Sequence, residues 1–159
     1  MIQLTIITVG TLKEKYLKDA VSEYKKRLSQ YARVEEISIK EERINDEDNP
    51  AEIERALSLE GEKILERIPD LAYTVALCVE GVRFDSEALA RKIEAETASS
   101  GKLCLIIGSS HGLSKKVKDS AALRLSVSDL TFPHQLMQVI LAEVLYRSFT
   151  IIAGKKYHK

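Results

Sequence analysis

The amino-acid sequence predicts an α/β fold: an open, mostly parallel sheet with helices on both faces, forming one domain over residues 1–159. Short apolar runs rich in β-branched residues alternate along the chain with longer segments of helical periodicity. The chain has 159 residues, 45% hydrophobic and 30% charged, which suits one domain with a sizeable core. No repeat, low-complexity tract or shift in composition marks a linker between domains.

The first predicted elements are a strand, a helix and a second strand. Leu4–Val9 is apolar and β-branched, and Gly10 interrupts it. From about Tyr16 to Tyr31, apolar residues recur on one side of a helix. Val34–Lys40 then alternates apolar and polar residues, which is typical of a strand.

The second helix has a clear start signal. The acidic stretch Glu41–Asp48 has the polarity of a surface loop, and Asn49–Glu52 follows it. Asn can accept backbone N–H groups, Pro suits the first helical position, and Glu stands three residues after the cap. We expect this helix to run to about Ile68, where Pro69 stops it, and Tyr73–Val79 to form a buried strand.

A third helix and a fourth strand follow. The helix is predicted over residues 86–99, with Asp85 or Ser86 as its cap, and Gly101 ends it. The strand is predicted over Leu103–Ile107 because this run is short, apolar and β-branched.

The remaining elements are a short helix, a strand and a long helix. Ser114 can cap a helix that ends near Ala121, and Leu123–Ser128 is the fifth predicted strand. Pro133 opens a helix that continues to about Ile152.

The last predicted helix is apolar on more than one side. A surface helix of a monomer needs only one apolar stripe, so this helix is expected to be buried on two sides. Either a second copy of the chain covers the second side, or the helix is fully internal. We expect a homodimer with Leu141 and Leu145 in its interface.

The charges are balanced overall and uneven along the chain. The net charge is zero, from 24 basic and 24 acidic residues, which argues against a uniformly basic nucleic-acid-binding surface. Lys102–Lys159 nevertheless carries nine bases against three acids, whereas Glu41–Glu62 is acidic. A polyanionic partner is therefore expected to meet the C-terminal part, unless these charges are only solvated helix faces.

The composition also indicates the cellular compartment and argues against a bound metal. The longest apolar runs are far shorter than the roughly 20 residues that a membrane-spanning helix requires, and the first residues lack the features of a signal peptide. We expect a cytoplasmic protein with no membrane partner. Cys78 and Cys104 have no Cys or His at ligand spacing, so we expect buried free thiols and no metal.

One candidate site is the glycine-containing turn Ile106–Ser114. It follows a predicted strand and precedes a helix start, which is where open α/β sheets bind ligands. Glycines let the backbone approach a cofactor closely, although the turn alone could require them. The segment matches neither GxGxxG nor GxxxxGK[ST], so a classical dinucleotide site and a P-loop are disfavoured.

A second stretch, Val127–Gln135, leads from the fifth strand into the last helix, and here the sequence resembles a known family. Five separated segments, in order and over the whole chain, are similar to the ribosomal RNA large subunit methyltransferase H family of the SPOUT superfamily. They are Val9–Tyr16, Ile107–Gly108, Leu130–His134, Leu145–Arg147 and Tyr157–Lys159.

The resemblance implies a fold and a reaction. The fold is a SPOUT fold whose C-terminal part threads into a deep trefoil knot, in a homodimer packed through the knotted region. The reaction transfers a methyl group from S-adenosylmethionine to N3 of a pseudouridine in 23S ribosomal RNA, and the partner is this RNA within the ribosome. No metal is required.

The resemblance also implies a cofactor pocket. Its residues would be Leu77, Gly108, Val127, Ser128, Asp129, Leu130, Thr131 and Phe132. We expect the backbone at Asp129 to matter more than its side chain, and a side chain at Gly108 to fill the space of the ligand. Related sequences commonly have Gly where this one has Ser109, which is acceptable if its φ is negative. We expect His111 to be an exposed loop residue.

Four residues are candidates for the chemistry at the acceptor nitrogen. They are His134, Arg147, Tyr157 and His158. Arg147 suits an imide anion or phosphate, and Glu143 could orient a neighbour or pair with it at i and i+4. His134 could instead hydrogen-bond the turn at the helix start. The tail could be a frayed end, or it could stack a base and reach the other subunit.

Two other functions are compatible with the same core. One is another small α/β nucleotide-binding enzyme, which would turn over its substrate without RNA. The other is a non-catalytic ribosome-binding module, which would bind RNA without S-adenosylmethionine.

Overall fold

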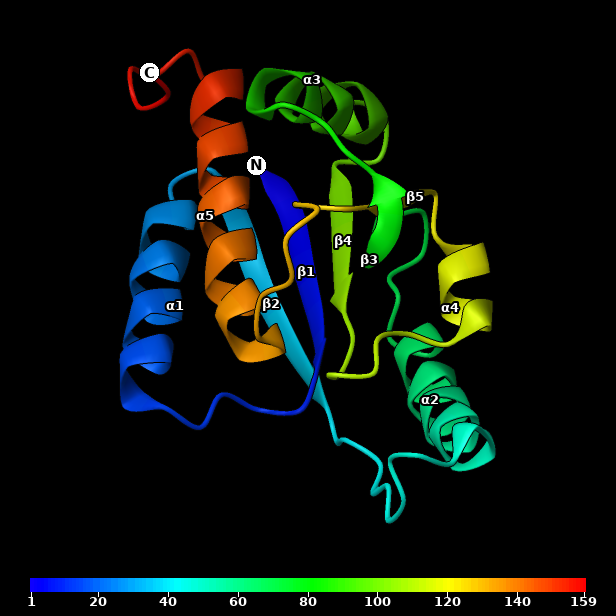
Figure 1. The fold of residues 1–159 in the computed structure, drawn as a ribbon. Helices are drawn as coiled ribbons and strands as arrows, with labels where there is room; N and C mark the ends of the chain where they lie inside the picture. The colour runs from blue at the N-terminus through cyan, green and yellow to red at the C-terminus, as the bar shows by residue number, and fades with distance from the viewer.

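A computed structural model describes residues 1–159, in which five strands and five helices alternate (Figure 1). The strands form one sheet in the order β2-β1-β4-β3-β5, and every neighbouring pair is parallel. The elements are β1 (Ile2–Val9), α1 (Lys15–Leu28), β2 (Ala32–Ile39), α2 (Pro50–Leu65), β3 (Tyr73–Val82), α3 (Ser86–Thr97), β4 (Lys102–Ile107), α4 (Lys115–Ser120), β5 (Leu123–Leu125) and α5 (His134–Ile152). The predicted α/β class and the order of its elements are confirmed.

The helices cover both faces of the sheet. Figure 1 shows α1, α3 and α5 on one face and α2 and α4 on the other. Successive strand residues point to opposite faces, so each face has its own core. Leu4 and Leu105 belong to the cluster under α1, α3 and α5, whereas Ile7 and Ile106 belong to the cluster under α2 and α4.

The predicted capping residues begin three of the helices. The side chain of Asn49 accepts hydrogen bonds from the backbone N–H groups of Ala51 and Glu52 at 3.1 and 3.4 Å. Asp85 accepts from Ala88 at 2.7 Å, and the hydroxyl of Ser114 accepts from Val117 at 3.3 Å. These bonds satisfy N–H groups that have no partner within the helix.

The fifth strand ends three residues earlier than the sequence predicts. A bulge in β3 places both Leu77 and Val82 opposite Leu125, and the next N–H, of Ser126, donates to the carbonyl of Val82 at 2.9 Å. A Cβ at Gly81 would lie 2.7 Å from backbone atoms of Leu125 and Ser126, so only glycine permits this approach. The chain then leaves the sheet and crosses to α5 (Figure 1). The trefoil knot implied by the resemblance stays a prediction.

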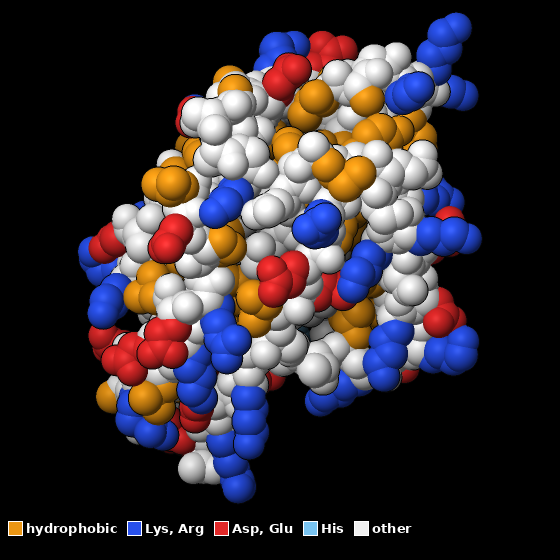
Figure 2. Space-filling model, turned by 180° about the vertical axis from the view of Figure 1, so that it is seen from behind, with side chains coloured by type: hydrophobic (Ala, Val, Ile, Leu, Met, Phe, Trp, Pro, Cys, Tyr) orange, Lys and Arg blue, Asp and Glu red, His pale blue; other side chains and the backbone are white.

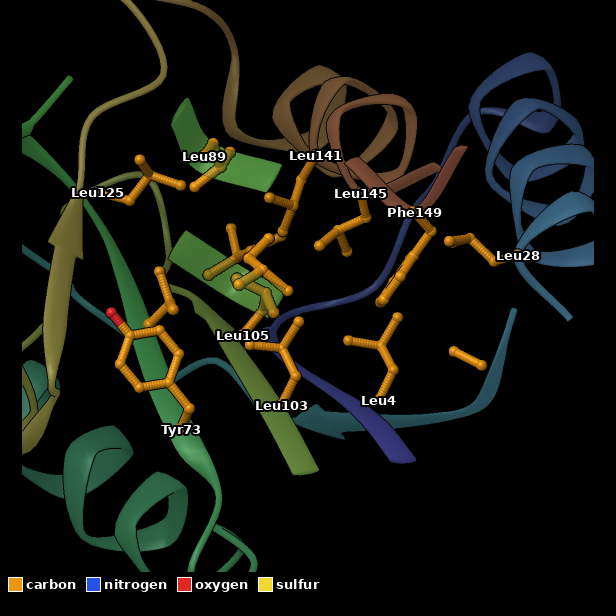
Figure 3. Close-up of a cluster of buried hydrophobic side chains, with 14 residues drawn as sticks. Leu4, Leu28, Tyr73, Leu89, Leu103, Leu105, Leu125, Leu141, Leu145 and Phe149 are labelled. Atoms are coloured by element: carbon orange, nitrogen blue, oxygen red, sulfur yellow. The ribbon is translucent and has the colours of Figure 1, made fainter. Parts of the chain in front are cut away.

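Helix α5 lies between α1 and α3 and is buried on the side that faces the sheet. Leu141, Leu145 and Phe149 are 1, 1 and 3% exposed and point toward Leu4 and Leu103 (Figure 3). The prediction that Leu141 and Leu145 lie in a dimer interface is therefore wrong, because they form the core of their own chain.

The side of α5 that faces away from the sheet remains partly exposed. Leu136 is 36% exposed, and Val139 and Ile140 are half-buried. By length and composition, α5 is also the one helix that could cross a membrane, although the core helices of soluble proteins can have the same length and composition. About one third of the apolar segment of α5 is buried inside the chain.

The two cysteines are buried free thiols, as predicted. Burial raises the pKa of Cys104 to about 12, so this thiol stays protonated and unreactive. No group of three or more His, Cys, Asp or Glu side chains is arranged to hold a metal ion.

Glu60 on α2 is a buried carboxyl beside the acidic loop that precedes this helix. It is 3% exposed, and one of its oxygens accepts a hydrogen bond from the backbone N–H of Glu42 at 3.4 Å. Burial raises the pKa of Glu60 to about 7, with a smaller contribution from the charges of Glu41 and Glu42 and an opposing one from that hydrogen bond. Glu60 therefore titrates near neutral pH.

Replacing Glu60 by Gln is predicted to change how stability depends on pH. The pKa is about 7 in the folded chain against an ordinary 4.5, so the favourable contribution of protonated Glu60 is complete below pH 4.5 and is lost as the pH rises through 7. Above pH 7, Glu60→Gln should raise the free energy of unfolding by up to about 3 kcal/mol, with little effect at pH 4.5. Urea denaturation at several pH values measures this, and the exposed Glu54→Gln is the control. Parallel pH profiles for Glu60→Gln and the wild type would contradict it.

Candidate active site

A cavity of about 320 Å³ lies at the carboxyl ends of β3, β4 and β5. Three segments form its walls: the end of β3 from Leu77, the turn Ile107–Leu113 after β4, and the loop Leu125–Phe132 after β5. His134 and Met137, at the start of α5, complete it. The carboxyl ends of parallel strands are the usual ligand site of such a sheet.

The predicted cofactor residues converge on this cavity, with one exception. Leu77, Gly108, Val127, Ser128, Leu130, Thr131 and Phe132 all line it. The side chain of Asp129 is 78% exposed and pairs with Arg83. The carboxylate of Asp129 is therefore engaged outside the cavity, and the expected role of its backbone stays a prediction.

The cavity combines apolar side chains with unpaired backbone groups. Leu77, Val127 and Phe132 are half-buried and supply an apolar surface. In the loop, the N–H of Leu130 bonds to the hydroxyl of Ser128 at 3.0 Å. The N–H groups of Val127, Thr131 and Phe132 have no acceptor within the chain. An apolar slot edged by free N–H groups suits a heterocycle such as adenine.

Gly108 lines the cavity, and the close packing of the turn requires a glycine at this position. A Cβ on Gly108 would lie 2.2 Å from the carbonyl oxygen of Gly112 and 2.6 Å from its carbon. The expectation that a side chain here would fill the ligand's space is wrong, because it would first meet the backbone across the turn. Gly112 closes the turn with φ +88°, and its N–H donates to the carbonyl of Ser109 at 2.9 Å.

The other two predictions for this turn have opposite outcomes. Ser109 is not among the residues with positive φ, so serine is compatible with the turn, as expected. His111 is not the exposed residue that we expected. Its side chain is 22% exposed, lines the cavity and lies 3.8 Å from a carboxylate oxygen of Glu47.

The other catalytic candidates form a second cluster near the C-terminal end of α5. Arg147 donates through Nη2 and Nε to Glu143 Oε1 at 2.6 and 3.1 Å. Its Nη1 lies 3.3 Å from His158 Nδ1, and its Cζ is 4.8 Å from the centre of the Tyr157 ring. Tyr157 donates its hydroxyl to the same Glu143 oxygen at 3.2 Å. The structure thus brings Arg147, Tyr157 and His158 together around Glu143.

The hydrogen bonds fix the protonation of this cluster. The bond to Glu143 raises the pKa of Arg147, so the guanidinium keeps its charge. Burial, and then the charge of Glu143, raise the pKa of Tyr157, so the phenol is a donor and not a base near pH 7. Because a guanidinium only donates, His158 Nδ1 is the acceptor in its hydrogen bond with Arg147.

The tail is folded back against α5 rather than frayed. Gly154 turns the chain with φ +64°, and the N–H of Lys155 donates to the carbonyl of Thr150 at 2.9 Å. The Tyr157 ring then packs edge-on against Tyr146 at 4.8 Å between centroids. Within the tail, Lys155, Lys156 and Lys159 are exposed.

Sequence reasoning missed the aromatic residues that support the tail. Tyr146 also contacts Tyr24 and Tyr31, at 6.3 and 6.1 Å between ring centroids, and the guanidinium of Arg27 lies 5.9 Å from its ring. These tyrosines occur at helical spacing, which is typical of core residues. Only the approach of the tail reveals their second role.

His134 lies far from the cluster of Arg147, Tyr157 and His158. It lines the cavity at the start of α5, and Arg147 stands about 20 Å further along the helix at a rise of 1.5 Å per residue. His134 makes no side-chain hydrogen bond within the chain, so the turn-binding alternative finds no support. One copy of the chain therefore holds the candidate residues in two separate groups.

The fold and the cavity define the class of the protein. A family model described as predicted SPOUT methyltransferase matches residues 2–158, so the chain is a SPOUT methyltransferase. A solved structure described as "Structural insights into the 2-OH methylation of C/U34 on tRNA" has a TM-score of 0.54, with 97% of this chain and 99% of that chain covered. At 12% sequence identity, this likeness shows the fold alone.

Curated relatives identify the family within this class. The ribosomal RNA large subunit methyltransferase H of Streptococcus gordonii (strain Challis) is 44% identical over 158 residues, with 99% of each chain covered. That of Streptococcus pneumoniae (strain CGSP14) is 44% identical over 159 residues, with the same coverage. The chain belongs to the ribosomal RNA large subunit methyltransferase H family. This membership sets aside both the unrelated α/β enzyme and the non-catalytic module.

Substitution of Gly108 by Ala is predicted to disrupt the turn. Its Cβ would overlap the carbonyl group of Gly112, so the free energy of unfolding should fall by about 3 kcal/mol. The control is Gly112→Ala in the same turn, where no atom lies within 4 Å and only the positive φ opposes a side chain. That control should cost about 1 kcal/mol. Urea denaturation measures both, and equal stability of Gly108→Ala and wild type would contradict the close contact.

Proposed function

We propose that the chain transfers a methyl group from S-adenosylmethionine to N3 of a pseudouridine in the 23S RNA of the large ribosomal subunit. The observation that carries the proposal is the convergence of seven of the eight expected cofactor residues on one cavity. The relatives, which are 44% identical, are named as ribosomal RNA large subunit methyltransferases, and this supports the class of RNA. The cytoplasm, where ribosomes are made, is the expected location.

The cavity at the ends of β3, β4 and β5 suits this cofactor. Leu77, Val127 and Phe132 would enclose the adenine, and the free N–H groups of the loop would bind its polar edge. When bound, S-adenosylmethionine supplies a methyl group that its sulfonium already activates. The chain's task is to hold the acceptor nitrogen in line and to favour loss of its proton.

The hydrogen bonds of each candidate side chain indicate the role that it would have in this reaction. In the cluster, Arg147 has permanent charge and N–H groups beyond those bound to Glu143 and His158, so it would stabilise the imide anion or a phosphate. Tyr157 and His158 would position Arg147, because the phenol stays protonated and the His158 acceptor nitrogen faces the guanidinium. His134, unbonded at the cavity, would receive the proton.

A homodimer would unite the two half-sites, which are the cavity beside His134 and the cluster around Arg147. His134 and Arg147 are about 20 Å apart along one rigid helix, so one copy cannot place both on the same base. The outer face of α5 carries Leu136, Val139 and Ile140, which are only partly covered by their own chain. Packing two such faces together would bury them and bring the tail of one copy toward the cavity of the other.

The RNA would meet a basic edge of the molecule. Seen from behind, Lys and Arg side chains crowd the edge on which α1 and the tail lie (Figure 2). Exposed residues there include Lys15, Lys18, Lys26, Lys155 and Lys156. The sequence predicted contact with a polyanion only for the C-terminal part, and the fold places α1 on the same surface.

The dimer interface is tested on the outer face of α5. Ile140→Asp should shift the chain from dimer to monomer, because a carboxylate would be buried without a partner. Sedimentation velocity measures the mass. The control is Leu71→Asp, at a turn where the side chain is 84% exposed. A wild-type chain that stays monomeric at high micromolar concentration would contradict the proposal.

Action of the tail across the dimer is tested with two inactive variants. One lacks residues 157–159 and the other is His134→Ala, and each alone should lose methyl transfer while binding S-adenosylmethionine in calorimetry. If the tail acts on the other copy, a refolded equal mixture should recover about a quarter of wild-type activity, since half the dimers hold one complete site. Tritiated methyl transfer to ribosomes that lack the modification measures this. A mixture as inactive as its parents would overturn action across the dimer.

A further inference from the structure

A second cavity, of about 400 Å³, lies on the other side of α5 from the candidate cofactor cavity. Its walls are α1, the carboxyl ends of β1 and β2, and the part of α5 that includes Gln138 and Leu141. Ile107, at the end of β4, contributes to both cavities. The two cavities therefore flank the first turns of α5, which is about 10 Å wide with its side chains.

The sheet becomes polar where it forms the floor of this cavity. On β1 and β2, the residues that face α1 and α5 begin as apolar side chains such as Leu4 and Val34. They end as Thr8, Glu36 and Ser38, which line the cavity. A parallel sheet covered on both faces is normally apolar throughout. Glu36 pairs with Lys25, and the Ser38 hydroxyl donates to the carbonyl of Gly10 at 2.9 Å. The hydroxyl of Thr8 has no partner within the chain and is left to bind a polar ligand.

The topology of the sheet also marks this place as a ligand site. Neighbouring strands β1 and β4 are followed by helices on opposite faces, α1 on one and α4 on the other. Such a switch point opens a crevice at the carboxyl ends of the two strands. The loop Gly10–Leu12 after β1 and Ile107 of β4 both line the second cavity.

The mouth of the cavity is polar and carries an unpaired positive charge. Lys18 makes no ion pair within the chain, whereas Lys25 pairs with Glu36 at 2.6 Å. The side chains of Ser22 and Gln138 line the same cavity and have no hydrogen-bond partner within the chain. Deeper in, Ile6, Val21 and Leu28 are apolar. An apolar interior, free hydrogen-bonding groups and a cation at the mouth match a planar base with an attached phosphate.

We propose that this cavity is a second nucleotide-binding site, which takes a nucleotide of the RNA substrate that neighbours the methylated one. The base would enter between α1 and the sheet, and Lys18 would neutralise its phosphate. RNA that is read in single-stranded form presents unstacked bases to protein pockets of this kind. The assignment of this nucleotide to the RNA substrate rests on the proposed function. The class of ligand, a base with a phosphate, rests only on the residues that line the cavity.

The first test needs no catalysis. Ser22→Trp should fill the mouth of the cavity, and Ser29→Trp, at the exposed C-terminal cap of the same helix and outside the cavity, is the matched control. In ¹⁵N–¹H spectra of the wild type, adding uridine or adenosine monophosphate should shift the amide signals of Thr11, Ser22 and Ser38. Ser22→Trp should lose these shifts and Ser29→Trp should keep them. Absence of nucleotide-dependent shifts in the folded wild type would overturn the site.

The second test identifies the source of the nucleotide. In methyl transfer to ribosomes, Ser22→Trp should raise KM about tenfold with kcat nearly unchanged, as expected for the loss of one enclosed base, and Ser29→Trp should not. Lys18→Gln, which leaves the cavity open, should raise KM and reduce its salt dependence. Nucleotide binding with an unaltered ribosome KM in Ser22→Trp would overturn the assignment to RNA. A wild type that binds nucleotides at this cavity yet methylates no ribosome would contradict the proposed function and leave the cavity's chemistry standing.

Discussion

The burial of one face of α5 is the constraint on which the rest of the structure depends. Leu141, Leu145 and Phe149 are at most 3% exposed, and a core packed to this degree leaves the helix no room to slide or rotate. The axis of α5 is therefore fixed between α1 and α3. Because α5 walls both cavities and carries Glu143 and Arg147, the same packing sets how far apart all of these groups lie.

The two ends of α5 belong to different groups of candidate residues because different segments of the chain contact them. At its start, the chain arrives from a loop in which the N–H groups of Val127, Thr131 and Phe132 are unpaired, and this end opens onto the candidate cofactor cavity. At its other end, Gly154 reverses the chain and Tyr157 packs on Tyr146, which holds the tail against the helix. A terminal segment normally frays, and here aromatic contacts and the Glu143 carboxylate order it instead.

The sequence was sufficient to predict those strands and helix starts that depend on local interactions. The strands follow from apolar runs, and the helix starts at Asn49, Asp85 and Ser114 follow from side chains that bond their own first turn. The early end of β5 could not be predicted in this way, since it depends on a bulge in a distant strand and on the absence of a side chain at Gly81. The role of Gly108 was misjudged for the same reason: its neighbour is the backbone across the turn, which composition does not reveal.

The spacing along α5 constrains how a dimer would complete the site. At 3.6 residues per turn, one outer stripe of the helix carries Leu136, Ile140, Glu143 and Arg147. Ile140 lies almost midway between His134 and Arg147. In an isologous pair of antiparallel helices crossing at Ile140, each residue meets one equally far on the other side of that point. Arg147 of one copy then stands level with His134 of the other. Such a pairing would set the two residues, which one rigid helix keeps about 20 Å apart, at the same level of the paired helices without any bending of the helix.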